Sequence, residues 1–156
     1  MDGKMPDSPP TSEIMAETPA LPWMNDPAEL LRHIRFNADG LVPAIATQFD
    51  SGEVLMMAWM NADALRETLR SGQVCYWSRS RQALWRKGET SGQVQRLIGM
   101  RLDCDGDTLL LLVDQAGVAC HTGRRSCFYR AWGKDGLETI LDVQTPPADL
   151  YGGAKG

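Results

Sequence analysis

Three of the chain's four cysteines lie close enough in sequence to bind one metal ion. Cys104, Cys120 and Cys127 are ligand types that suit zinc, and a catalytic zinc keeps three protein ligands and one open position for water. Their spacing lacks the paired Cys-x-x-Cys arrangement of zinc ribbons, and free cysteines are often simply buried. A three-ligand zinc site and three buried thiols therefore both remain open. Cys75 lies in an apolar segment and favours a core position.

An acidic cluster surrounds the first of these cysteines. Asp103, Asp105 and Asp107 offer hard oxygen ligands, which suit magnesium rather than zinc. Aspartate followed by glycine between two apolar runs is also typical of a hairpin turn, where aspartate is common without any metal. If the segment is extended, Cys104 points to the opposite face from Asp103 and Asp105. The pattern then predicts two separate metal sites, one with soft sulfur ligands and one with hard oxygen ligands.

His121 directly follows one of the candidate ligands, Cys120. Beside a metal, a histidine is either a general base or a further ligand. A surface histidine with no part in chemistry is the third interpretation.

Residues 76–92 combine cations, hydroxyl groups and glycines. Arginine, lysine, hydroxyl groups and backbone amides beside glycine bind phosphate, and a tryptophan can stack on a base. A solvated hairpin loop anchored by its tryptophan explains the same composition. Together with a second basic spot near Cys127, the segment provides six candidate substrate contacts: Arg79, Trp85, Lys87, Thr90, Ser91 and Arg124.

The elements that must position these residues are mainly strands. Short runs rich in β-branched or aromatic residues predict strands at residues 41–49, 54–59, 74–78, 94–102, 109–113 and 128–132. Asn61 caps a predicted helix at residues 62–70 that Gly72 ends, and Asp26 with Pro27 opens a shorter one. No alternation of strand and helix typical of a parallel sheet is present. We expect an α+β fold, predominantly antiparallel β with one or two short helices.

Length and composition predict one domain at residues 27–145, since a chain of 156 residues forms a single core. Proline-rich and glycine-rich ends predict flexible tails at residues 1–26 and 146–156. The net charge of −4 and the pI of about 5.1 oppose nucleic-acid binding, which usually needs a basic face. No apolar run approaches the roughly 20 residues of a membrane span, and no targeting signal is apparent. A cytoplasmic location without membrane contact is expected.

Six motifs in this chain resemble those of the phosphoribosyl-AMP cyclohydrolase family. They are residues 55–61, 76–81, 84–92, 103–107, 119–123 and 126–128. The resemblance runs from about residue 41 to residue 132, with the motifs in the family's order and spacing. Both tails lie outside it.

The resemblance implies hydrolysis of the N1–C6 bond in the adenine ring of phosphoribosyl-AMP by zinc-activated water. The product is the formimino-AICAR ribonucleotide (ProFAR), in the third step of histidine biosynthesis. It also implies an intertwined homodimer with one zinc per subunit, held by Cys104, Cys120 and Cys127 from both chains. Magnesium would bind the three aspartates. Three thiolates leave zinc a weak acid, so a nearby base is useful, and we expect His121 to be a catalytic base rather than a fourth zinc ligand.

Two other functions were weighed from the residues. A zinc deaminase of bases requires an H-x-E motif and a P-C-x-x-C motif, and the chain contains neither. A structural zinc module that binds nucleic acid or protein would use the basic loop as its contact surface. The acidic pI and the three-ligand count oppose that alternative.

Overall fold

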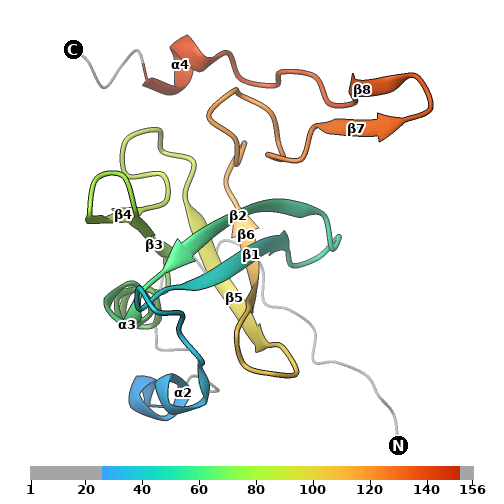
Figure 1. Cartoon of the computed structure of the whole chain (residues 1–156). Helices are drawn as coiled ribbons and strands as arrows, with labels where there is room; N and C mark the ends of the chain where they lie inside the picture. The colour runs from blue at the N-terminus through green and yellow to red at the C-terminus, as the bar shows by residue number, and fades with distance from the viewer. Residues whose placement is uncertain (1–25, 152–156) are drawn as a thin grey trace, which may run out of the picture.

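The computed structural model describes residues 26–151, and within them a single six-stranded sheet carries the core. Its strands are β1 (Val42–Gln48), β2 (Val54–Met60), β3 (Cys75–Ser78), β4 (Ala83–Arg86), β5 (Gln95–Leu102) and β6 (Leu109–Gln115). Their order is β4-β3-β2-β1-β6-β5 (Figure 1). All neighbours pair antiparallel except β1 and β6, which are parallel. The predicted α+β fold with a predominantly antiparallel sheet is confirmed.

The sheet curls until segments near its two ends meet. Gln73, just before β3, bridges to Arg96 on β5, and the Val74 amide donates to the Gln95 carbonyl at 2.9 Å. Burial alternates along β6 because successive side chains of a strand point to opposite faces. The curled sheet therefore encloses one apolar core. Among its members are Val42, Leu55, Met60, Leu65, Tyr76, Leu97 and Leu111.

Two helices begin at the residues that the sequence predicts. Asp26 caps α2 (Pro27–His33) and Asn61 caps α3 (Ala62–Ser71), each side chain accepting a backbone N–H from the first turn. Gly72 ends α3 in the left-handed conformation at φ 76°, which glycine adopts without the steric cost of a Cβ atom. No helix within residues 26–151 is both long and apolar enough to cross a membrane.

The structure differs from the predicted elements mainly after residue 128. The last predicted strand is shifted to β7 (Arg130–Gly133), which pairs with the unpredicted β8 (Gly136–Thr139) in a separate hairpin. The unpredicted strand β4 is four residues long and is defined by its pairing with β3.

The C-terminal end also differs from the predicted loose segment. Residues 147–151 form a short helix, α4 (Pro147–Tyr151), and Leu150 within it is buried. The helix depends on this tertiary contact, which a proline-rich composition does not reveal. The parts of the predicted tails at residues 1–25 and 152–156 lie outside the described residues.

Candidate functional site

Cys120 and Cys127 are brought together by a loop that follows β6 and folds back on itself. The backbone amides of Ala119 and Cys120 donate to the carbonyls of Arg125 and Arg124 at 3.0 and 3.1 Å. The Cys127 amide donates to the carbonyl of a β2 residue, Leu55, at 2.7 Å. The loop, called here the thiol loop (residues 116–129), thus fixes two cysteines against the end of the sheet.

The electrostatics of the two thiols suit a bound cation. Although Cys127 is exposed at the surface, desolvation of its sulfur by the surrounding loop, followed by the charge of Cys120, raises the pKa of this thiol to about 12. The hydroxyl of Thr122 donates to the Cys120 sulfur at 3.0 Å, which stabilises negative charge there. Two neighbouring thiolates repel one another, and a metal ion bound between them relieves that repulsion and displaces the protons.

Arg125 anchors the thiol loop to β1, to β6 and to the residue that precedes β2. Its guanidinium donates to the side chain of Gln48 on β1 at 2.9 Å and to the backbone carbonyl of Gln115 on β6 at 3.1 Å. A third bond, at 3.3 Å, goes to Glu53 immediately before β2. Because the N–H groups of one planar guanidinium reach these acceptors in a fixed geometry, this residue holds the base of the loop.

Lys87 lies beside the thiol pair, although the sequence suggested it as a phosphate contact. Its ammonium donates to the Ala119 carbonyl at 2.6 Å, and the side chain is buried. Burial lowers the pKa of Lys87, while the negative charges of Cys127 and Cys120 oppose that change. The cation therefore reduces the cost of keeping the two sulfurs ionised.

A pocket of about 260 Å³ adjoins this lysine. It is formed mainly by the loop between β4 and β5, in which Gly88 has a φ of 86° and no room for a side chain, since a Cβ atom would lie 2.5 Å from the Val94 nitrogen. Four of the predicted contacts, Trp85, Lys87, Thr90 and Ser91, line the pocket together with Arg81, Gly88, Glu89 and Tyr151.

The other two predicted contacts are not among the lining residues. The Arg79 guanidinium lies 5.0 Å from the ring centroid of Trp59, and that of Arg124 lies 4.1 Å from the ring of Tyr129. The Nε atom of Arg124 also donates to the Leu141 carbonyl at 2.8 Å. In the described chain, these two arginines contact neighbouring protein groups.

Four pocket residues were not selected from the sequence. Arg81, Gly88 and Glu89 lie within residues 76–92, the segment whose composition already indicated phosphate binding. Their place beside the selected contacts was the signal that could have identified them. Tyr151 was assigned to a tail, and no local signal connects it with a loop some sixty positions earlier.

His121 is exposed and follows the buried Cys120 on the thiol loop. Within residues 26–151 it belongs to no group of side chains spaced to share an ion. The exposed position leaves the imidazole accessible to a ligand beside the thiols.

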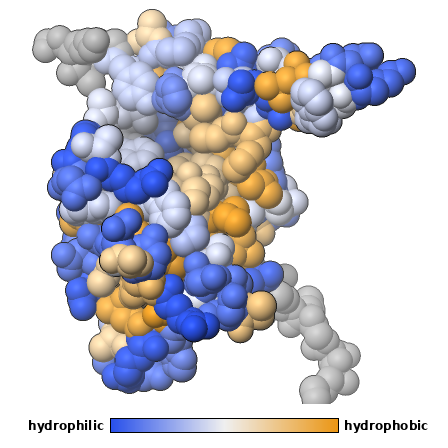
Figure 2. Space-filling view, viewed as in Figure 1, coloured by the Kyte–Doolittle hydropathy of each residue, from blue (hydrophilic) through white to orange (hydrophobic). Residues whose placement is uncertain are grey.

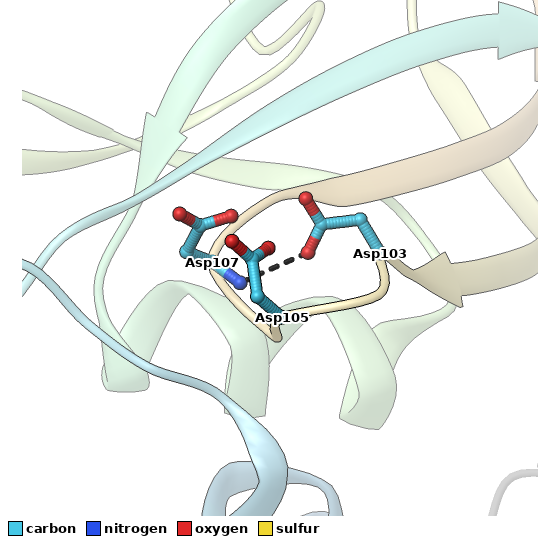
Figure 3. A group of neighbouring side chains, drawn as sticks. All are labelled: Asp103, Asp105 and Asp107. Carbon is cyan, nitrogen blue, oxygen red and sulfur yellow. Dashed lines mark hydrogen bonds between the residues drawn. The ribbon is translucent and has the colours of Figure 1, made fainter.

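The acidic cluster lies on the loop between β5 and β6, and its three carboxylates face one another (Figure 3). Their oxygen atoms lie within 4.8 Å of one another, and one Asp103 oxygen accepts the Asp107 amide at 3.0 Å. Hydrogen bonds among the carboxyls raise the pKa of Asp107, with Asp105 the first contributor. The geometry is one that a hard divalent cation would favour.

One part of the sequence argument about this loop is wrong. Strand β5 ends at Leu102, so residues 103–108 form a turn and the alternation of a strand does not apply to Cys104. The hairpin itself is present, but its connection is longer than two residues. Gly106 turns at φ 78° against the His33 carbonyl, where a Cβ atom would lie at 2.8 Å.

Cys104 is exposed on this loop and lies far from the other two thiols of its own chain. At about 3.3 Å per residue, the length of β6 separates the acidic loop from the start of the thiol loop by about 20 Å. Figure 1 shows the two loops at opposite ends of β5 and β6. Among residues 26–151, the aspartate trio is the only group of potential ligands close enough to share an ion.

The segment that carries both loops matches a known family. A family model described as phosphoribosyl-AMP cyclohydrolase matches residues 56–129. A protein of that name from Rhodospirillum centenum is 67% identical over 123 residues, which cover 79% of this chain and 92% of the relative. Another, from Alkalilimnicola ehrlichii, is 63% identical over 139 residues and 89% of each chain. One from Granulibacter bethesdensis is 69% identical over 120 residues, covering 76% of this chain and 94% of the relative.

Proposed function

This chain belongs to the phosphoribosyl-AMP cyclohydrolase family, and on that premise we propose the reaction that it catalyses. It hydrolyses the N1–C6 bond of the adenine ring in phosphoribosyl-AMP and releases ProFAR, within histidine biosynthesis. The observation that carries this proposal is the position of Lys87. This one residue lines the pocket and also lies beside two thiols suited to zinc.

We propose that the zinc ligands are Cys120 and Cys127 of one chain and Cys104 of a second copy. The paired thiols are a soft donor set of the kind that zinc binds, and the charge of the nearby Lys87 offsets part of the rise in the pKa of Cys127. Cys104 is exposed and lies too far away to join them within one chain. In a homodimer the third cysteine can come from the second copy, because the acidic loop of one copy can meet the thiol loop of the other.

An exposed apolar surface supports the second copy. Val54, Met57 and Phe128 are exposed on and beside β2, and Trp132 on β7 is 81% exposed. Figure 2 shows hydrophobic residues gathered on one face below the projecting β7–β8 hairpin. Apolar surface of this kind marks an interaction site. An intertwined dimer would cover it.

The same dimer would place the aspartates near the thiols of the partner. Asp103 and Asp105 flank Cys104 in the sequence, so a contact that delivers this cysteine also delivers the acidic loop. Magnesium fits the three clustered carboxylates and, when bound, supplies positive charge for the substrate's phosphates.

The chain's own residues then have separate tasks. Zinc held by Cys104, Cys120 and Cys127 would supply a water of lowered pKa for attack on C6. Arg81 with the hydroxyls of Thr90 and Ser91 binds phosphate in the pocket. His121 takes a proton from the attacking water and returns it to N1 as the N1–C6 bond breaks.

The reaction is tested by turnover with and without a zinc chelator. We expect the purified chain to convert phosphoribosyl-AMP to the ring-opened product, followed by ultraviolet absorbance. A chelator should abolish this conversion, and added zinc should restore it. A folded, zinc-loaded protein that leaves the substrate unchanged would contradict the proposal.

Replacing His121 by alanine should separate catalysis from metal binding. We expect kcat to fall by about 10²–10⁴-fold, the usual contribution of general acid–base catalysis, with the zinc content unchanged. His33→Ala, a change of the exposed histidine on α2, is the matched control and should keep wild-type turnover. Loss of zinc from His121→Ala would instead identify the imidazole as a metal ligand.

A further inference from the structure

The segment that leads into α4 is attached to the thiol loop. The amides of Gln144 and Thr145 both donate to the Gly123 carbonyl, at 2.8 and 3.1 Å. Gly123 has a φ of 85°, and a Cβ atom there would lie 1.8 Å from the Thr145 carbonyl oxygen. Backbone of the C-terminal segment thus occupies the space that a side chain on the thiol loop would need. Its position is set by the loop that carries the two cysteines.

Helix α4 itself is anchored by its fourth residue. Leu150 is 5% exposed, and its amide and that of Asp149 donate to the Pro146 carbonyl. Burial of a leucine is a large stabilising contribution for a helix of only five residues. The anchor fixes the position of the next residue, Tyr151.

Tyr151 lines the pocket beside the loop that follows β4. Figure 1 shows α4 on the same side of the molecule as that loop. The pocket therefore combines two aromatic residues, Tyr151 and Trp85, with a cation and hydroxyl groups. Aromatic faces bind a base, and cations with hydroxyls bind phosphate. At about 260 Å³, the pocket is slightly smaller than the roughly 300–1,000 Å³ typical of small-molecule sites.

We infer that α4 forms one wall of the substrate pocket and that Tyr151 contacts the nucleotide through its ring. This inference rests on the proposed function for the identity of the substrate. The pocket then has walls from two distant parts of the chain. Tyr151 contributes to substrate affinity, while the bond cleavage depends on the thiol loop.

Substitutions at position 151 test this role. Tyr151→Ala should raise KM for phosphoribosyl-AMP by about tenfold, within the range for loss of one base–aromatic contact, and change kcat by less than about twofold. Tyr151→Phe keeps the ring and should restore the wild-type KM. Asp149→Asn, on the exposed side of the same helix, is the matched control and should leave KM unchanged.

AMP binding measured by calorimetry provides a readout that does not require turnover. AMP affinity should fall in Tyr151→Ala and be retained in Tyr151→Phe and Asp149→Asn. If the wild type binds AMP but does not convert phosphoribosyl-AMP, the proposed reaction fails while the affinities still decide the role of Tyr151. Unchanged KM and AMP affinity in Tyr151→Ala would overturn the inference. So would an equal loss in Tyr151→Phe or Asp149→Asn.

Discussion

A Cys127→Ala chain should purify as a folded protein that contains no zinc and has lost its turnover. We expect kcat/KM to fall by roughly three orders of magnitude or more, because without the ion no water of lowered pKa is supplied. The fold should survive, because the bond that fixes this position, from the Cys127 amide to the Leu55 carbonyl, uses the backbone alone. Zinc content by atomic absorption and turnover by ultraviolet absorbance are the measurements.

Cys75→Ala is the matched control for this experiment. Cys75 is a free and fully buried thiol on β3, and it takes no part in the proposed site. Its replacement should cost about 1 kcal/mol in the free energy of unfolding and leave zinc content and kcat intact. A zinc-free Cys127→Ala protein that retains activity would disprove the zinc mechanism.

A heterodimer of two inactive chains should regain activity. If each zinc site takes Cys104 from one chain and the thiol pair from the other, pairing a Cys104→Ala chain with a Cys127→Ala chain leaves one site complete. Each parental homodimer is expected to be inactive. The heterodimer, isolated with a different affinity tag on each chain, should show about half of the wild-type rate, since one of two symmetric sites is intact.

The reciprocal pairing is the control. A chain with both Cys104→Ala and Cys127→Ala, paired with a wild-type chain, has one damaged ligand in each shared site and should be inactive. A site built within one chain predicts the opposite result for both pairings. Activity of the second heterodimer together with inactivity of the first would therefore contradict the shared site.

The elements with strong local signals were predicted from the sequence. Asn61 and Gly72 bound α3 because a capping side chain and a left-handed glycine act within one helical turn. Five strands in the sheet are close to their predicted ranges, since β-branched and aromatic runs mark them locally. Strand β4 and hairpin strand β8 were missed, because pairing with a neighbour defines them.

The sequence by itself also determined which candidate metal ligands and substrate-binding residues the chain contains. Three cysteines, three aspartates and a basic loop are visible as residue types, and their motifs led to the family that the comparisons confirm. Four of six suggested substrate contacts line one pocket. These features are local, because a motif keeps its ligands and its loop within a few residues.

Only the tertiary structure decided which of these candidate residues lie together and which lie apart. It joins Cys120 to Cys127 through a folded loop, and it places Cys104 beyond the length of β6. It also brings Tyr151 to a pocket formed some sixty residues earlier in the chain. The reason is physical: these relations depend on how a curled sheet and a buried leucine bring distant segments together, and such contacts leave no pattern in neighbouring residues.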